Sequence, residues 1–299
     1  MIGWDGEGVP PAALARLTRA RSSGVRTSLL AVASQTGLDA CGFASVGEVM
    51  GCFVEYIGWR GYANCGYYGA FGTPGPFGSG GFRTVGGPIP TVTSGAGGVV
   101  GLAPFVDALN AGWDGAIGRM LAECAALGGD GVVGVQLGEH HLESGVREFT
   151  ALGTAVRAAG GVHAARPFAT ELSGSDVAKL VHAGWIPAGV IVAIAAGIRH
   201  DDYQTLIAAQ LLAGNVEVPG YTELVTHVRA DARRVLADKS HALGADGAIL
   251  TAPLRVRIHE VEVTESHRDH VAEATLTATA VARFEPTTAP VFSPIVPLD

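Results

Sequence analysis

The decapeptide ALGGDGVVGV spans Ala126–Val135, and a related decapeptide, ALGADGAILT, spans Ala242–Thr251. Five of their ten positions are identical, at a constant offset of 116 residues. Both follow apolar residues spaced three and four apart, which is typical of an amphipathic helix. Gly128 and Gly244 suit left-handed helix caps, and β-rich residues come after them. The decapeptide therefore predicts a helix end followed by a strand start, twice in one chain.

The similarity extends beyond the decapeptides in both directions. Upstream, Leu29–Arg60 resembles Pro167–Arg199 in pattern, at an offset near 138. Downstream, Ala151–Val156 resembles Leu276–Val281 at an offset of 125. Each repeat is therefore predicted to contain a strand, a helix and two further strands. This order predicts an α+β fold of two domains, each a helix packed on a small antiparallel sheet.

The segment Gly61–Gly98 interrupts the first repeat. It contains thirteen glycines, six aromatic residues and a single charge, Arg83. This composition differs from that of an ordinary solvated linker. Two interpretations remain: a loop whose aromatic side chains anchor it to a neighbouring subunit, or a mobile and adhesive loop. The apolar character of the segment favours packing.

These observations divide the chain into consecutive parts. Residues 1–25 are predicted to be an N-terminal helical extension. Residues 26–160 form the first domain, which contains the glycine-rich insertion 61–98. Residues 166–285 form the second domain. Residues 286–299 contain four prolines and no glycine, so we expect an extended C-terminal arm.

The composition points to a protein that buries surface between subunits. Hydrophobic residues make up 48% of the chain and charged residues 16%, and the mean hydropathy is +0.31. Such a chain has apolar surface to spare after filling its own core, which favours a homo-oligomer. The net charge of −8 argues against nucleic acid and anionic membranes as partners.

The sequence also argues against a membrane span and for a cytoplasmic location. The longest apolar run, Ala183–Ile198, is shorter than the ~20 residues that a span needs and contains Pro187. We expect part of this run to be a buried strand. The chain begins without the basic and apolar segments of a signal peptide. Its four cysteines form no CxxC pair, as expected for a reduced protein.

These motifs resemble a known family. Ala126–Val156, with its helix end, Val-rich strand and GTAV strand, is similar to the end of the YbjQ-like proteins. ASVGEVMG, Ala44–Gly51, resembles the Gly-Glu-Val strand near the start of that family. In the second repeat the corresponding element has become WIPAGV, while ALGADG and TATAV remain. The resemblance covers Arg26–Ala159 and Pro167–Phe284, so the chain is interpreted as a tandem duplication.

The resemblance implies a dodecin-like fold, a helix on a small antiparallel sheet, and assembly into pentameric rings. The family carries a heavy-metal-binding label that names no established ligand set. A tandem repeat with a glycine-rich insertion departs from the family pattern, which leaves the geometry of the ring open here.

Two histidine pairs are the candidate metal ligands. His140 and His141 follow Glu139 just after the first post-helix strand, and His267 and His270 lie in the equivalent connection of the second repeat. Imidazole with carboxylate suits a divalent transition metal such as zinc, copper, nickel or iron. A ring could bring these loops together from neighbouring subunits. The alternative interpretation is that both loops are polar hairpin ends exposed to solvent.

Three classes of function are compatible with the sequence. The first is a structural protein that self-assembles into a homo-oligomeric ring or shell, with any cargo or partner protein left open. The second is a heavy-metal-binding protein that uses His140, His141, His267 and His270. The third is an enzyme, but the sequence lacks a GxSxG elbow, a GxxxxGK[ST] loop and an HExxH motif. No catalytic residue or organic cofactor is predicted.

Overall fold

The computed structural model describes residues 4, 8–24, 27–57, 98–143, 145–160, 163, 166–210, 214–264 and 267–284. Residues 61–97 of the predicted insertion and the predicted arm 286–299 lie outside these ranges. Within the described residues, no helix combines the length and hydropathy that crossing a membrane would require.

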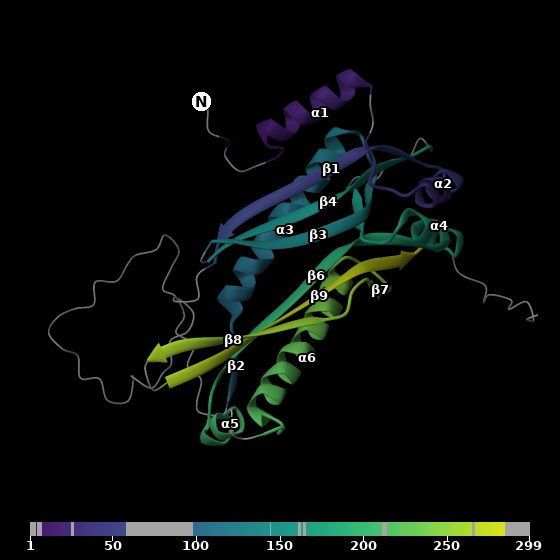
Figure 1. Ribbon diagram of the computed structural model, residues 1–299. Coiled ribbons are helices and arrows are strands. Elements are labelled where there is room, and N and C mark those ends of the chain that lie inside the picture. The colour runs from purple at the N-terminus through teal and green to yellow at the C-terminus, as the bar shows by residue number, and fades with distance from the viewer. Residues whose placement is uncertain are drawn as a thin grey trace, which may run out of the picture.

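The helices and strands fall into two halves (Figure 1). The first half contains α2 (Val32–Ala40), β1 (Phe43–Tyr56), α3 (Ala103–Ala126), β3 (Gly131–Glu143) and β4 (Val146–Ala158). The second half contains α4 (Gly174–His182), β6 (Trp185–His200), α6 (Pro219–Ala242), β7 (Gly247–Leu250), β8 (Arg255–Thr264) and β9 (His267–Arg283). The shorter elements are α1 (Pro11–Ser23), β2 (Val99–Gly101), β5 (Phe168–Thr170) and α5 (Tyr203–Ala208).

The decapeptides form the same structure in both halves. α3 and α6 end at the first residue of each decapeptide, and β3 and β7 begin five residues later. Gly128 and Gly244 have φ values of 73° and 67°, the left-handed conformation that the sequence predicts. Asp130 accepts a hydrogen bond from a main-chain N–H at the end of β4, and Asp246 accepts one from the end of β9, both at 2.8 Å. The predicted helix end and strand start are confirmed at both places.

The first strands of the two halves correspond at an offset of 142 residues. β1 and β6 each contain a bulge, at Gly47 and at Gly189. A Cβ on Gly47 would lie 3.3 Å from Leu127, and a Cβ on Gly189 would lie 3.3 Å from Leu243. The offset near 138 predicted from the sequence, which pairs Gly51 with Gly189, is corrected by this geometry. Short apolar strands carry little information about register, whereas a bulge fixes it.

The strands form two sheets, called sheet A and sheet B. Sheet A has the order β1-β4-β3-β5, and sheet B has the order β2-β6-β9-β7 with β8 also paired to β9. The prediction of purely antiparallel sheets is wrong for sheet A, because β5 runs parallel to β3. β5 precedes α4 of the second half, and β2 precedes α3 of the first half but joins sheet B. Each half thus contributes one short strand to the sheet of the other.

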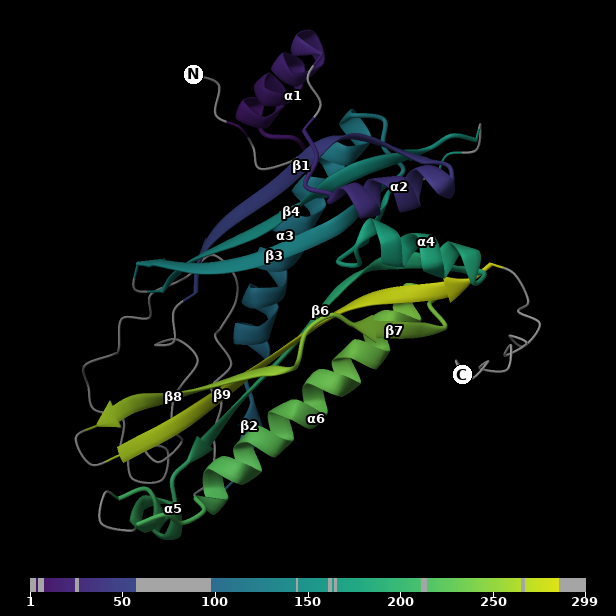
Figure 2. The ribbon, with the colours of Figure 1, turned by 45° about the vertical axis from the view of Figure 1, so that its right-hand side comes forward.

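The helix α3 lies between the two sheets, and α6 covers the far face of sheet B (Figure 2). On one side α3 packs against Val49, Phe149 and neighbouring residues of sheet A. The same core contains Val192 and Ile194 of sheet B. The opposite face of sheet B packs on α6, with Ala195 in that second cluster. The layers are therefore sheet A, α3, sheet B and α6.

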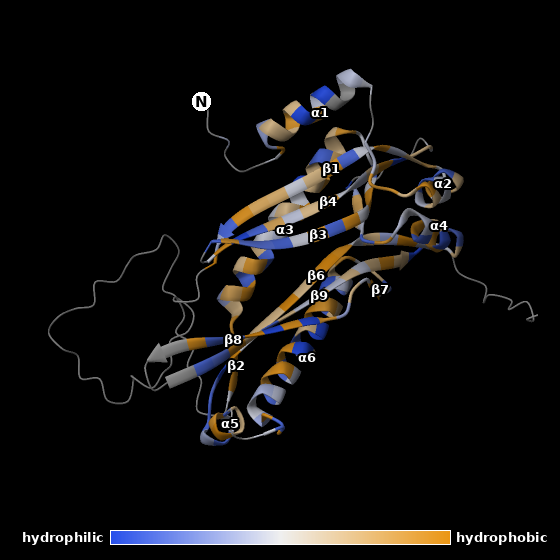
Figure 3. Cartoon of the chain, in the orientation of Figure 1, coloured by the Kyte–Doolittle hydropathy of each residue, from blue (hydrophilic) through white to orange (hydrophobic). Residues whose placement is uncertain are grey.

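The compositions of the two long helices match these positions. Each has 24 residues, but α3 contains four charged residues and α6 contains seven. Figure 3 shows α3 as predominantly hydrophobic and α6 as a mixture of hydrophobic and hydrophilic segments. α3 is buried where it meets the two sheets and exposes only a narrow stripe that includes Asp114 and Gly118, whereas α6 is amphipathic and faces water along one side. α6 exposes Arg229, Arg233 and Arg234 to solvent.

Candidate functional site

His140 and His141 lie near the end of β3, and both are exposed. His140 is directly opposite Glu148 of β4. His141 Nε2 is 3.8 Å from Glu139 Oε1. These two histidines are accessible and have carboxylates nearby, but they lie within β3 and are paired with β4, not after the strand as the sequence predicts.

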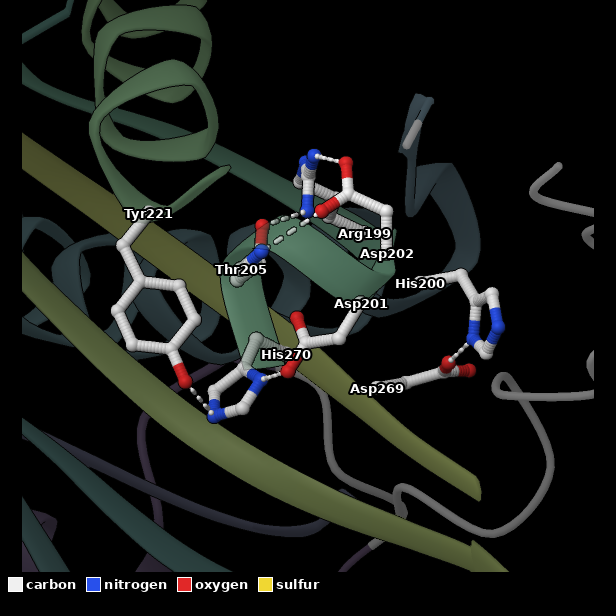
Figure 4. Close-up of polar contacts among 8 residues, drawn as sticks. All are labelled: Arg199, His200, Asp201, Asp202, Thr205, Tyr221, Asp269 and His270. Atoms are coloured by element: carbon white, nitrogen blue, oxygen red, sulfur yellow. Dashed lines mark hydrogen bonds and ion pairs between the residues drawn. The ribbon is translucent and has the colours of Figure 1, made fainter. Parts of the chain in front are cut away.

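His270 has a different environment, because it is buried in β9 (Figure 4). Its Nδ1 is 2.9 Å from Asp201 Oδ2, and its Nε2 is 2.9 Å from the hydroxyl of Tyr221. The side chain of His267 lies outside the described residues. In the described part of the chain, no three His, Cys, Asp or Glu side chains gather closely enough to hold a metal ion.

A second group of polar residues lies beside His270, where β6 ends. His200 Nδ1 is 2.7 Å from Asp269 Oδ1. Arg199 donates to Asp202 at 2.8 Å, and Asp202 caps α5 by accepting the Thr205 N–H at 2.8 Å. The hydrogen bonds from Thr205, assisted by Arg199, lower the pKa of Asp202 to about 2. Asp202 is the N-cap of α5, so the chain passes from the end of β6 directly into this short helix.

This cluster joins β6, β9, α5 and α6, and sequence analysis identified only part of it. The strand register pairs Arg199 with His270 and His200 with Asp269. Arg199 and Tyr221 carried no motif that would single them out. Only the register of the β6–β9 pair, which places Arg199 opposite His270, would have identified Arg199 as part of this cluster. Most of the network is buried, and it anchors the end of sheet B.

A buried ion cluster connects the two sheets. Arg147 of β4 donates to Glu139 Oε1 at 2.7 Å and to Glu273 Oε2 of β9 at 3.3 Å. Arg257 of β8 lies 3.7 Å from Glu139 Oε2. Arg147 and Glu273 are both almost fully buried. Because these contacts cross from sheet A to sheet B, they hold the two halves together.

Three large apolar side chains of β1 are exposed on the outward surface of sheet A. Met50, Val54 and Tyr56 alternate on this surface and are 40%, 51% and 73% exposed. We call the surface formed by these three side chains the open face. Exposed large apolar side chains grouped on one surface are typical of an interaction site.

The equivalent surface of sheet B is covered. At the offset of 142 residues, Met50, Val54 and Tyr56 correspond to Val192, Ala196 and Ile198. These side chains are 4%, 6% and 3% exposed, because they belong to the core that contains α3. The same position on the two sheets is therefore apolar in both halves and is buried in only one.

The edges of β1 and β6 are occupied by charged side chains from the helices. The Met50 N–H donates to Glu123 Oε2 at 2.9 Å. Lys239, at the position of α6 equivalent to Glu123, donates to the Val192 carbonyl at 2.7 Å. Burial lowers the pKa of Lys239. A strand edge that is occupied in this way is a poor template for another strand.

Comparisons with known proteins show two similarities. Residues 89–159 match the family YbjQ, described as "Putative heavy-metal-binding", which confirms the resemblance for this part of the sequence. An encapsulin nanocompartment protein of Mycobacterium tuberculosis is 32% identical over an alignment of 147 residues; the match covers 45% of this chain and 53% of that protein. The chain thus spans about half the length of this relative. No solved structure matches the chain.

Proposed function

We propose that this chain, whose residues 89–159 match the YbjQ family, is a structural protein that assembles with copies of itself. Its building blocks are two tandem YbjQ-like domains, and the product is a high-order homo-oligomeric ring or shell. The equivalent elements follow one another in the same order in both halves, at offsets of 142, 116 and 125 residues, which supports the tandem arrangement. The name of the encapsulin relative supports assembly into a shell.

The open face is the observation that carries this proposal. In the second half, α3 buries the equivalent surface of sheet B. In the first half, Met50, Val54 and Tyr56 remain exposed among the described residues. α3 packs against a sheet on each of two sides, but α6 packs on one side only, since its outward surface presents Arg229 and Arg233 to solvent. Burying the open face against another copy of the chain would remove apolar surface from water, which is the main driving force for stable association.

The family resemblance favours a ring of five-fold order. A chain with two domains can occupy two positions in one ring or link two rings, and both arrangements produce closed assemblies. Assembly through faces is compatible with the occupied edges of β1 and β6, because it needs no free strand edge.

Native mass spectrometry of the untagged protein tests the proposal. We expect an assembly whose mass is an integer multiple of the 30.5 kDa chain, with a multiple of five for the ring. Assembly should be retained in moderate salt, because the open face is apolar and its association is not screened. A protein that remains monomeric at micromolar concentration would show that the proposal is wrong.

Metal binding is the second candidate function. The description of the family match at residues 89–159 favours it, and that segment contains His140 and His141. On the same surface Cys52 donates to Glu148 Oε1 at 3.2 Å, and Glu148 lies opposite His140. Imidazole, carboxylate and thiol are suitable donors for a divalent transition metal. Burial and Glu148 raise the pKa of Cys52 to about 11, so an ion would have to displace the thiol proton.

The donors of one chain do not form a complete shell, so neighbouring copies would have to supply the rest. His270 contributes only if an ion replaces the Tyr221 hydroxyl at Nε2. The same native mass measurement distinguishes the two functions. Stoichiometric metal in the assembly, lost in His140→Ala/His141→Ala but kept in His227→Ala, would support metal binding. An assembly that contains only substoichiometric metal would contradict metal binding and support the structural function only.

A further inference from the structure

A pocket lies between the two sheets beside α3. Leu137 of β3 lines it from sheet A, residues of β8 and β9 line it from sheet B, and Trp113 of α3 contributes an apolar wall. The cavity is small, with a volume of about 110 Å³, and it opens to solvent. Ligand sites often occur where two domains meet, because the contact between them leaves concave surfaces. The pocket is independent of the open face.

The cationic wall of the pocket comes from β8. Arg255 and Arg257 are two residues apart on this strand, so both side chains project from the same face. Arg257 has an ion-pair partner, Glu139 Oε2, at 3.7 Å. Arg255 is exposed and makes no hydrogen bond or ion pair with another residue that the structure describes. Its guanidinium group is therefore available to an anionic group of a ligand.

The anionic wall comes from Glu171, which follows β5. Its carboxylate accepts a hydrogen bond from the Thr251 hydroxyl, and it has no cation within 4.0 Å in the described part of the chain. Burial raises the pKa of Glu171, as expected for a carboxyl group without a positive partner. Glu273, which also lines the pocket, is already paired with Arg147. Glu171 is thus the carboxylate available to a cationic group.

We propose that this pocket binds a small zwitterion with an apolar body, of the free α-amino acid class. Arg255 pairs with the carboxylate of the ligand, and Glu171 pairs with its ammonium group. Trp113 and Leu137 contact the apolar side chain. The hydroxyls of Thr275 and Thr277 on β9 line the same pocket and complete its polar surface. The ligand supplies each unpaired charge with a partner of the opposite sign.

Isothermal titration calorimetry on the full-length protein tests this assignment with matched probes. The zwitterions are leucine and phenylalanine; 4-methylpentanoate lacks the ammonium group of leucine, and 3-methylbutylamine lacks its carboxylate. We expect at least one zwitterion to bind and each singly charged analogue to bind at least about tenfold more weakly, because a charged hydrogen-bond partner is then left unpaired. Failure of both zwitterions to bind at millimolar concentration, or equal binding of the analogues, would overturn the assignment.

Three variants separate the pocket from general effects of charge. Arg255→Gln and Glu171→Gln should each weaken binding of the zwitterion by at least about tenfold. Arg233→Gln, on the exposed surface of α6, should bind it like the wild type. Unchanged affinity in both pocket variants would place the ligand elsewhere and contradict the proposal. Loss of binding with an intact assembly, or the reverse, distinguishes this proposal from the proposed function.

Discussion

Replacing Gly51 by alanine is expected to lower the free energy of unfolding by at least about 3 kcal/mol. A Cβ at this position of β1 would lie 1.8 Å from the carbonyl oxygen of Ala116 and 2.6 Å from the nitrogen of Met120. Both are main-chain atoms of α3, so no side-chain rotation can relieve the overlap. The helix would have to move away from sheet A and disrupt the core between the sheets. Urea unfolding followed by circular dichroism measures the effect.

Gly118→Ala is the matched control for this prediction. Gly118 is an exposed residue of the same helix, and a Cβ there would meet no atom within 4 Å. The substitution is expected to raise stability by about 0.5–1 kcal/mol, since alanine loses less backbone entropy in a helix. A Gly51→Ala protein as stable as the wild type would mean that α3 does not lie against β1.

Arg147→Met is expected to cost about 3–5 kcal/mol of stability. The substitution keeps much of the side-chain volume but removes the cation that Glu139 and Glu273 share. Both carboxylates face Arg147 in the region between the sheets, where water cannot fully replace it. The loss should separate the two halves before either half unfolds, because this cluster crosses from sheet A to sheet B. Hydrogen exchange at β3 and β9 would detect such a separation.

Adding Glu273→Gln to the Arg147→Met protein should restore part of the lost stability, since it removes one uncompensated charge. Arg234→Met provides the surface control. Arg234 pairs with Asp231 at 3.1 Å on the exposed side of α6, and exposed pairs contribute less than about 1 kcal/mol. Equal effects of Arg147→Met and Arg234→Met would show that the cluster does not stabilise the contact between the sheets.

The local elements could be predicted from the sequence because their signals are local. The decapeptide at Ala126–Val135 marks the end of α3 and the start of β3, and its counterpart marks α6 and β7. Part of the apolar run Ala183–Ile198 lies in strand β6, as predicted, since β6 begins at Trp185. Helical periodicity, a capping glycine and a run of β-branched residues each depend only on residues that are close in sequence. They can therefore be recognised without the tertiary structure.

The arrangement of these elements depends on contacts that are distant in sequence. Nothing in the three residues of β5 indicates that they pair in parallel with β3. The apolar composition of α3 fits a buried helix, but does not show that two sheets enclose it. The pairing of Arg147 with Glu273, 126 residues away, has no sequence signal either. Long-range pairings of this kind are set by the packing of whole elements.

The candidate site shows the same division. His140 and His141 occupy an exposed hairpin end, which short-range polarity predicts. The sequence assigns His270 to the equivalent position of the second repeat, but the structure buries it against Asp201 and Tyr221. Only the register of β6 and β9 distinguishes these environments. The open face was also beyond prediction, because its meaning depends on which surface α3 covers.

Sedimentation velocity of the wild type and of Val54→Lys/Tyr56→Lys tests most directly whether the open face makes the assembly. Two ammonium groups on this surface cannot be buried without a large desolvation cost, so the variant should sediment as a smaller species with an unchanged far-ultraviolet circular dichroism spectrum. Val32→Lys, at an 84% exposed position of α2, should sediment like the wild-type assembly. A monomeric wild type, or a double variant that sediments with the wild-type assembly, would contradict the account.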